Sequence, residues 1–306
     1  MTDLRIIYMG TPEFAVPSLQ ILVENGFNVV AVITAPDKPK GRGQKLATSP
    51  VKDYAVSQNI PVLQPTNLKS LEFIEELRSY KANLQIVVAF RMLPEVVWDM
   101  PEIGTFNLHA SLLPQYRGAA PINWAIINGE KETGVTTFFL KHEIDTGNII
   151  FQEKEPIEED DNVGDLYKRL MAKGANLVLK TVKAIQQGDY PQLPQDESGE
   201  IKHAPKIFKE TCEIDWKKSS EEVYNFIRGL SPYPAAWTTI NGVQFKIYDT
   251  EKLDFAVAGE NPGDYSTDNK TYLHIQTGGK ALAIKELQMQ GKKRMKIEDF
   301  LRGNSL

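Results

Sequence analysis

Two residue types that could take part in acyl transfer, an amide and an imidazole, lie close together in a short alternating stretch. Across residues 104–114 polar and apolar residues alternate, so an extended backbone places Asn107, His109 and Ser111 on one face. An Ile-Asp-Thr-Gly sequence further along the chain supplies Asp145. An amide can hold a developing oxyanion, an imidazole can transfer a proton, and a carboxylate can fix the tautomer of that imidazole. We therefore expect Asn107, His109 and Asp145 to converge in a catalytic site.

The same alternation also fits an ordinary strand with one hydrated face. Two features favour catalysis. The alternating stretch stops at Pro114 and opens into a glycine-containing loop, and open α/β sheets place their ligands where strands end in this way. The chain has only four histidines, so His109 uses a scarce side chain. His142 is a rival for the imidazole role, but its two charged neighbours predict an exposed loop.

Composition limits the class of protein. The chain has 306 residues, of which 42% are hydrophobic and 25% charged, as expected for a globular protein of one large or two ordinary domains. No apolar run is long enough to span a membrane, and the N-terminus lacks the layout of a signal peptide. The single cysteine, Cys212, excludes an intrachain disulfide. We therefore expect a cytoplasmic protein without a membrane contact.

The net charge and the metal-ligand motifs limit which binding partners are expected. The formal net charge of −5 argues against a protein that coats nucleic acid non-specifically, although a local basic patch remains compatible with it. The chain has no C-x-x-C motif and no helical pair of histidines, so no metal is expected. Because no exposed apolar stripe is evident in the sequence, a monomer is expected.

The first part of the chain alternates strands with helices. Apolar runs typical of buried parallel strands occupy residues 4–9, 29–33, 85–90 and 106–110. Thr11 is expected to cap a helix that starts at Pro12 and stops at Asn25-Gly26. The pattern predicts an α/β fold with a Rossmann-like doubly wound parallel sheet. Gly10-Thr11-Pro12 is not a G-x-G-x-x-G motif, so a dinucleotide is poorly supported.

The second part is built differently. Residues 189–206 are polar and rich in turn formers, which predicts a linker between a catalytic domain over 1–188 and a second domain over 207–306. In that second domain short β-like runs lie at residues 237–240, 244–248, 271–275 and 281–284. Asn241-Gly242 predicts a hairpin between the first two. A small OB-like β-barrel is expected, and this architecture suits an oligonucleotide partner.

Two basic clusters stand out in this acidic chain. The first lies in a segment where Gly and Pro disfavour regular structure, and its cations are Lys38, Lys40, Arg42 and Lys45. The second, near the C-terminus, contains Lys292, Lys293 and Arg294. Each cluster alone fits a solvated loop or turn. Together they favour a localised site for a polyanion.

The motif over residues 106–118, together with Asp145-Thr146-Gly147, resembles the 10-formyltetrahydrofolate-dependent formyltransferases. Further similarity at residues 9–14, 36–43 and 204–216 extends over nearly the whole chain and is closest to the members that act on charged initiator tRNA. The resemblance implies transfer of a formyl group from 10-formyltetrahydrofolate to the amino group of methionine on that tRNA. It implies no metal.

The resemblance also implies roles for individual residues. The catalytic trio would be Asn107, His109 and Asp145. Folate contacts would come from Ser111, Leu112, Leu113 and Pro114 and from the pterin-side loop of Phe90, Arg91, Met92 and Leu93. The basic segment of Lys38, Lys40, Arg42 and Lys45 would contact tRNA, with Arg42 entering the acceptor stem, and Lys292, Lys293 and Arg294 would add to this surface. Many relatives have Tyr-Gly in place of Phe90-Arg91, so the shape of the pterin pocket is expected to differ.

Three other functions fit parts of the sequence. A formyltransferase for a small amine would use the same trio, and so would a formyltetrahydrofolate hydrolase, but neither needs the basic segment or the second domain. A nucleic-acid-binding module without chemistry would leave Asn107, His109 and Asp145 unexplained, and the acidic net charge counts against it. Stabilisation by a tetrahydrofolate analogue would separate an enzyme of this family from a pure RNA binder.

Overall fold

The computed structural model describes residues 2–40, 45–257, 261–304 and 306, and the chain forms two compact units. The N-terminal unit comprises Met1–Arg117, Gly134–Glu155 and Lys168–Lys202, and the C-terminal unit comprises Gly118–Thr133, Pro156–Tyr167 and His203–Leu306. Each unit therefore gathers segments that are distant in the sequence. Domain boundaries at 188 and 207 stay a prediction.

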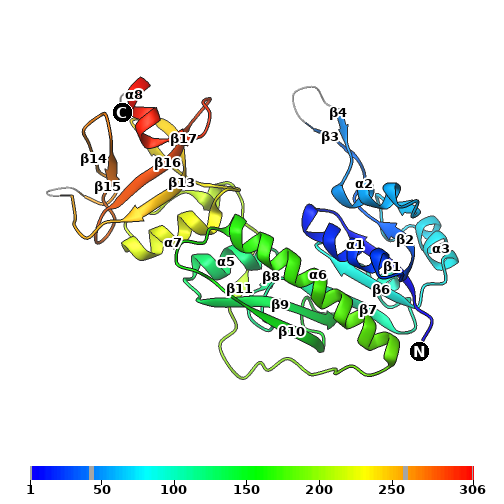
Figure 1. Cartoon of the computed structure of the whole chain (residues 1–306). Coiled ribbons are helices and arrows are strands. Elements are labelled where there is room, and N and C mark those ends of the chain that lie inside the picture. Colours follow the sequence, from blue (N-terminus) through cyan, green and yellow to red (C-terminus); the bar gives the residue numbers. More distant parts are fainter. Residues whose placement is uncertain (1, 41–44, 258–260, 305) are drawn as a thin grey trace. The chain divides into compact units, whose positions relative to one another are not determined.

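A seven-stranded sheet forms the centre of the N-terminal unit (Figure 1). Its order is β10-β9-β7-β6-β1-β2-β5, with β1 next to both β2 and β6 in parallel, and β7 parallel to β6. The strands are β1 (Arg5–Gly10), β2 (Asn28–Ile33), β5 (Val62–Leu63), β6 (Leu84–Val88), β7 (Gly104–His109), β9 (Glu132–Phe139) and β10 (Ile149–Pro156). This confirms the predicted α/β fold. The sheet is mixed rather than purely parallel, because β9 runs antiparallel to β7.

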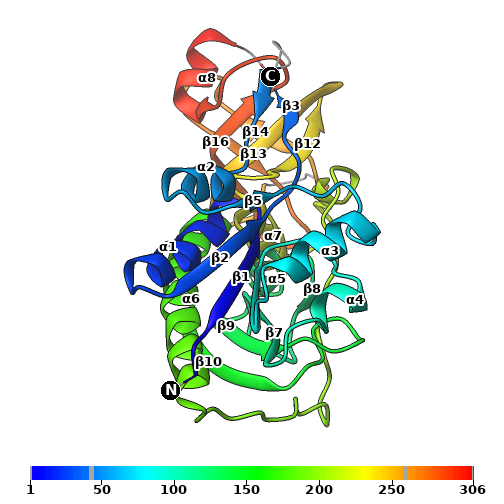
Figure 2. The same cartoon turned by 90° about the vertical axis from the view of Figure 1, so that its right-hand side faces the viewer.

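Helices cover both faces of this sheet. They are α1 (Val16–Glu24), α2 (Pro50–Ser57), α3 (Leu71–Ser79), α4 (Glu95–Trp98) and α6 (Val163–Gln187). In Figure 2 α1 and α6 lie on one side of the strands and α3 and α4 on the other. A Cβ at Gly174 would lie 2.7 Å from Leu108 Cδ2, so α6 packs directly on β7. On the opposite face, Phe73 and Leu77 of α3 and Val97 of α4 share a buried cluster with the sheet.

The first helix starts later than the sequence predicted. Pro12 has an extended backbone and precedes a 3-10 turn, η1 (Glu13–Ala15), and no side chain caps either this turn or α1. The predicted cap at Thr11 is therefore wrong. A proline is favoured in the first turn of a helix, and α1 begins at Val16 with such a proline. The end agrees with the prediction, since Asn25 is the C-cap and Gly26 has a φ of 74°.

The described parts of the first basic cluster belong to a short antiparallel pair of strands. β3 (Lys38–Lys40) pairs antiparallel with β4 (Lys45–Ala47), and Pro39 lies opposite Leu46. The expectation that this segment avoids regular structure is thus wrong for these strands. A proline is tolerated there because both strands of an isolated pair are edges, where a missing N–H faces solvent. Arg42 lies outside the described residues.

The C-terminal unit contains a curled antiparallel sheet, which confirms the predicted small β-barrel-like domain (Figure 1). Its order is β12-β13-β16-β15-β14, with β17 also paired to β16. The strands are β12 (Ala236–Ile240), β13 (Val243–Lys252), β14 (Tyr265–Thr267), β15 (Leu273–Ile275), β16 (Leu282–Met289) and β17 (Met295–Lys296). Asn241 and Gly242 both have positive φ, 48° and 78°, so the predicted two-residue hairpin turn is confirmed.

Helices pack against this sheet and against one another. They are α5 (Pro121–Ile127), α7 (Ser220–Leu230), α8 (Ile297–Gly303) and the 3-10 turn η2 (Glu210–Cys212). α7 starts at a capping box in which Ser219 and Glu222 bond reciprocally. Its Ile227 joins Phe245 and Phe300 in the core. A separate two-stranded sheet pairs β8 (Arg117–Gly118) with β11 (His203–Ala204).

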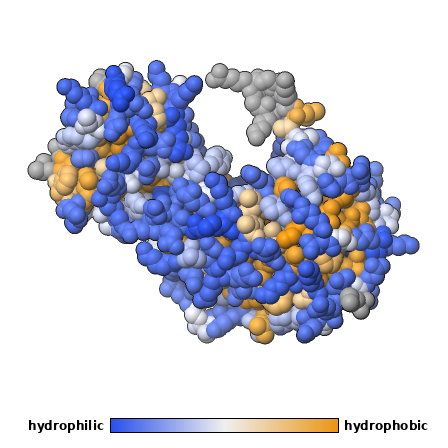
Figure 3. All heavy atoms as spheres, viewed as in Figure 1, coloured by the Kyte–Doolittle hydropathy of each residue, from blue (hydrophilic) through white to orange (hydrophobic). Residues whose placement is uncertain are grey.

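Polar residues dominate the surface seen in Figure 3, where hydrophobic residues form smaller groups. Among the described residues no helix has the length and apolar character needed to cross a membrane.

Candidate active site and nucleic-acid surface

Strand β7 carries two of the predicted catalytic residues at its carboxyl end. Phe106 and Leu108 are buried, as the alternation predicted, and Leu108 faces α6. Asn107 and His109 therefore point to the other face of the sheet. The carboxyl ends of β6 and β7 meet at one edge because these strands are parallel, with Val88 opposite Leu108. The segments that follow them, including the loop of Phe90 to Leu93, start from this edge.

The structure brings His109 and Asp145 together. His109 Nδ1 lies 4.0 Å from Asp145 Oδ2, and the two side chains are only 7% and 11% exposed. His109 Nε2 lies 2.8 Å from the backbone oxygen of Tyr116. The rival His142 is 73% exposed and pairs with Glu95 on the surface. The buried imidazole is therefore the one positioned for chemistry.

The contact with Tyr116 fixes the tautomer of His109. A carbonyl oxygen only accepts hydrogen bonds, so His109 Nε2 must carry the proton. In the neutral ring Nδ1 then presents a lone pair towards Asp145. Protonation at Nδ1 would give a cation beside that carboxylate. Nδ1 is consequently the nitrogen available to a reactant.

Asn107 is half-buried on the same face of β7 as His109, and its register partners are Val87 on β6 and Phe138 on β9. Within the described part of the chain no group forms a hydrogen bond with its side-chain amide. A half-buried amide in this position can donate to a ligand atom without first breaking a bond to the protein. β7 and the loop after β9 thus carry the amide, the imidazole and the carboxylate; the structure brings His109 and Asp145 together, and the catalytic role of all three residues stays a prediction.

The loop after β9 holds Asp145 in an unusual backbone conformation. Asp145 has a φ of 57°, in the left-handed region that few non-glycine residues adopt. Two residues later, Gly147 lies against the backbone of Phe139, and a Cβ there would be 1.5 Å from the Phe139 oxygen. Thr146 Oγ1 donates to the Glu143 oxygen at 3.0 Å. Only glycine fits at residue 147, which explains the Asp-Thr-Gly sequence in steric terms.

The segment after β7 is held by an internal hydrogen bond and by polar side chains of β9 and β10. Ser111 is fully buried, and its Oγ donates to the Gln115 oxygen at 2.6 Å. Leu113 is buried too, and its backbone oxygen accepts from Gln152 Nε2 at 2.9 Å. Leu112 and Pro114 are half-buried. In this segment Leu112 and Pro114 offer more surface to a ligand than Ser111 and Leu113, and all four folate assignments stay predictions.

Arg91 is tied to a neighbouring loop. Its guanidinium donates to the backbone oxygens of Pro65 and Thr66, the latter at 3.1 Å, and lies 5.7 Å from the centre of the Phe90 ring. Met92 is 73% exposed, and Phe90 and Leu93 are half-buried. The bulk of Arg91 is therefore directed at the loop after β5.

The predicted basic residues differ in their surroundings. Lys38, Lys292 and Lys293 are exposed. Arg294 pairs with Glu286 at 2.5 Å and lies 4.2 Å from the centre of the Tyr248 ring, so it already has partners in the C-terminal unit. The backbones of Lys40 and Lys45 belong to β3 and β4.

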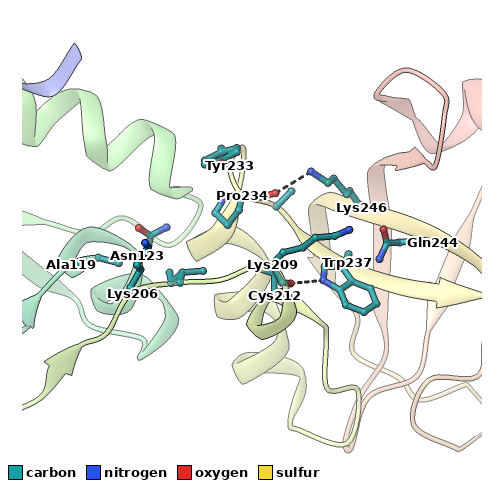
Figure 4. A pocket seen from close by; sticks show the side chains of 13 residues that line it. Ala119, Asn123, Lys206, Lys209, Cys212, Tyr233, Pro234, Trp237, Gln244 and Lys246 are labelled. Atoms are coloured by element: carbon teal, nitrogen blue, oxygen red, sulfur yellow. Dashed lines mark hydrogen bonds between the residues drawn. The ribbon is translucent and has the colours of Figure 1, made fainter. Parts of the chain in front are cut away.

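A basic pocket of about 420 Å³ lies within the C-terminal unit (Figure 4). Lys206, Lys209 and Lys246 line it together with the aromatic residues Tyr233 and Trp237. The sequence did not reveal these lysines as one group, because Lys206 and Lys209 lie on one segment and Lys246 lies on another, and folding brings the two segments together. Tyr233 is 81% exposed, an unusual position for a large ring, and the aromatic residues are the signal that could have indicated a binding surface.

Hydrogen bonds from side chains to backbone oxygens connect the segments that line this pocket. Trp237 Nε1 donates to the Lys209 oxygen at 2.8 Å, and Lys246 Nζ donates to the Pro234 oxygen at 3.2 Å (Figure 4). Cys212 forms part of the wall and is 1% exposed. Burial raises the pKa of the Cys212 thiol, an effect that the nearby Lys246 partly opposes. The thiol is thus a structural group at neutral pH.

The described residues contain no group of three or more His, Cys, Asp or Glu side chains placed to hold a metal ion.

Comparison with known proteins assigns the family. A model described as formyl transferase matches residues 4–182, and one described as formyl transferase, C-terminal domain, matches residues 206–305. The chain belongs to the formyl transferase family. These matches confirm the family membership that the motifs predicted. The chain is therefore a transferase.

Named members of the formyl transferase family match along nearly the whole chain. The methionyl-tRNA formyltransferase of Bacteroides fragilis is 58% identical over 309 residues, covering 98% of this chain and 95% of that protein. The methionyl-tRNA formyltransferase of Phocaeicola vulgatus is 60% identical, with 98% and 96% covered. The N-formyltransferase from Helicobacter canadensis, solved with folinic acid and dTDP-3-aminofucose, is 25% identical, with a TM-score of 0.68 over 95% of this chain and 100% of that chain.

Proposed function

We propose that this protein transfers the formyl group of 10-formyltetrahydrofolate to the amino group of methionine on charged initiator tRNA, in the cytoplasm. The observation that carries the proposal is the close approach of His109 and Asp145, with Asn107 on the same strand face as His109, in a chain that is 58% identical to a methionyl-tRNA formyltransferase over nearly its full length. The folate bound by the Helicobacter canadensis relative supports a folate donor.

In this reaction the neutral methionine amine attacks the formyl carbon, and negative charge develops on the formyl oxygen. The Asn107 amide and protonated Nδ1 of His109 donate hydrogen bonds to that oxygen. Because Nε2 is already bonded to Tyr116, the donation comes from Nδ1. Asp145, 4.0 Å from Nδ1, stabilises the imidazolium.

Collapse of the intermediate forms the amide bond to methionine and breaks the bond between the formyl carbon and N10 of the folate. One proton leaves the amine, and N10 takes up one proton. Asp145 lies close enough to His109 to relay this proton through water. Such a proton relay contributes roughly 10²–10⁴ to the rate.

The donor is expected to lie along the segment from Ser111 to Pro114 and the loop from Phe90 to Leu93. Both segments follow the carboxyl ends of adjacent parallel strands, where open α/β sheets bind ligands. The exposed Met92 and half-buried Phe90 provide apolar surface for a pterin ring. Arg91 would act on this pocket through the loop that it holds.

The tRNA is expected to contact cations in both units. The strand pair of β3 and β4, with Lys38, Lys40 and Lys45, follows β2 in the N-terminal unit, and the pocket with Lys206, Lys209 and Lys246 lies in the C-terminal unit. Lysines neutralise phosphates, and the exposed Tyr233 ring can stack on a base. These groups explain how a chain of net charge −5 could bind a polyanion locally.

The decisive experiment measures formyl transfer from 10-formyltetrahydrofolate to methionine-charged initiator tRNA. Free methionine and uncharged tRNA are the controls. Transfer to charged tRNA alone, lost in His109→Ala, is the expected result. Transfer to a small amine or to water in place of charged tRNA would refute the proposal and favour the alternative functions.

The tRNA surface has its own test. Replacing both Lys206 and Lys246 by Gln should weaken tRNA binding and lower the slope of log affinity against log salt by about 0.7–0.9 for each phosphate that is no longer neutralised. Lys270→Gln, an exposed lysine elsewhere in the same unit, is the control. An unchanged slope in the double variant would remove this pocket from the interface.

A further inference from the structure

The segment expected to be a simple linker is bound to the N-terminal unit beside the candidate active site. Leu193 and Ile149 exchange two backbone hydrogen bonds of 2.8 and 2.9 Å. Tyr190 packs near Phe139, with ring centres 5.9 Å apart. The segment therefore follows the hairpin of β9 and β10, whose connecting loop carries Asp145.

One side chain of this segment bonds directly to that loop. Gln195 Nε2 donates to the backbone oxygens of Asp145, at 2.7 Å, and Gly147, at 2.9 Å. Both N–H groups of the Gln195 amide therefore donate to the two ends of the Asp-Thr-Gly turn. Gln195 is itself half-buried, so these bonds are partly shielded from water.

The other end of the same amide is also held. Gln195 Oε1 accepts from Arg117 Nη2 at 2.6 Å and from Nε at 3.2 Å. Arg117 in turn pairs with Glu197 at 2.5 Å. A guanidinium only donates, so this contact fixes which end of the amide faces Arg117 and aims the amino group at the loop.

We propose that Gln195 is a positioning residue for the Asp145 carboxylate. Asp145 has a left-handed φ of 57°, a conformation that persists only where its surroundings impose it. The Gln195 amide bonds to the backbone oxygens on both sides of Thr146 and keeps the turn in place. The carboxylate stays close to His109 as a result. This inference rests on the proposed function, because the role of Asp145 comes from it.

The chemistry of the amide makes the proposal testable. Gln195→Glu keeps the size of the side chain and an acceptor for Arg117, but it replaces the donor by an oxygen that faces two carbonyl oxygens. The hydrogen bonds from Arg117 are therefore kept, whereas the two hydrogen bonds to the backbone oxygens of Asp145 and Gly147 are lost. Gln195→Met removes the donor without adding charge and serves as the second variant. Gln192→Ala, at an exposed glutamine of the same segment, is the matched control.

Formyl transfer to charged tRNA is measured for each variant, together with its unfolding temperature. We expect kcat to fall about 10- to 100-fold in Gln195→Glu and Gln195→Met, as displacement of a catalytic group by about 1 Å would cause. KM for both substrates should stay within about twofold, because the turn acts on the chemical step. Gln192→Ala should behave as wild type.

A double-mutant cycle with Asp145→Asn separates positioning from a general structural effect. If Gln195 acts through Asp145, adding Gln195→Glu to Asp145→Asn should change kcat by less than about twofold. Fully additive losses, or wild-type kcat in both folded Gln195 variants, would overturn the inference. If Asp145→Asn alone keeps wild-type kcat, the proposed mechanism fails independently of Gln195.

Discussion

Replacing Gly147 by alanine tests whether the turn geometry controls catalysis. A Cβ at this position would lie 1.5 Å from the Phe139 oxygen and 2.7 Å from its carbonyl carbon. Both atoms belong to the backbone of β9, which is hydrogen-bonded to β7. The strand cannot yield without losing sheet bonds, so the turn itself must move.

The size of that movement follows from the same distance. Real Cβ contacts stay above 3.0 Å, so the turn must shift by about 1.5 Å to admit the methyl group. A shift of about 1 Å in a catalytic group can cost about 10²-fold in rate, which corresponds to about 2.7 kcal/mol of activation free energy. Overpacking of this kind also lowers the free energy of unfolding by about 1–3 kcal/mol.

The assay is single-turnover formyl transfer to charged tRNA, with the unfolding temperature measured in parallel. Gly199→Ala is the matched control, since a Cβ at that glycine would have no neighbour within 4 Å. A folded Gly147→Ala enzyme with wild-type single-turnover rate would refute the reasoning, because Asp145 could then move without consequence. Equal losses in Gly199→Ala would show that the effect is not local.

Three further predictions concern other groups. Asn107→Ala should lower kcat by roughly 10²–10³ with little change in folding, as measured by transfer kinetics and circular dichroism, because it removes one oxyanion donor. Burial raises the pKa of Cys212, so the native thiol should react with a thiol reagent far more slowly than the unfolded one at mildly alkaline pH; equal rates would contradict this. Hydrogen bonds from Lys252 lower the pKa of Glu159 and Glu221 below their ordinary 4.5 in the folded state, so their stabilising effect is present above that pH and is lost as the pH falls below it. Thermal unfolding from neutral to acid pH should therefore show a weaker acid dependence in Lys252→Met, and identical profiles would exclude this contribution.

Local sequence was sufficient for the elements with a strong pattern. The continuous apolar run at β2 predicted a buried parallel strand because a strand covered on both faces has no hydrated side. Asn241-Gly242 predicted its hairpin because both residues tolerate positive φ. The predicted start of the first helix was wrong. Thr11 is a residue type that suits a helix cap, but Pro12 has an extended backbone and a 3-10 turn follows it, so the helix begins only at Val16.

The sequence by itself determined the residue types of the candidate site and the face that presents them. Alternation put Asn107 and His109 on one side of β7, since side chains of a strand alternate in direction. It could not determine the 4.0 Å approach of Asp145, the bond of His109 to Tyr116, or the hold of Gln195 on the turn. The contacts of Asp145 with His109 and of Gln195 with the turn join groups far apart along the chain, and the bond of His109 to Tyr116 depends on the path of the intervening loop, so only the packed backbone sets these distances. The three pocket lysines illustrate the same point, because charges on separate segments form one site only after folding.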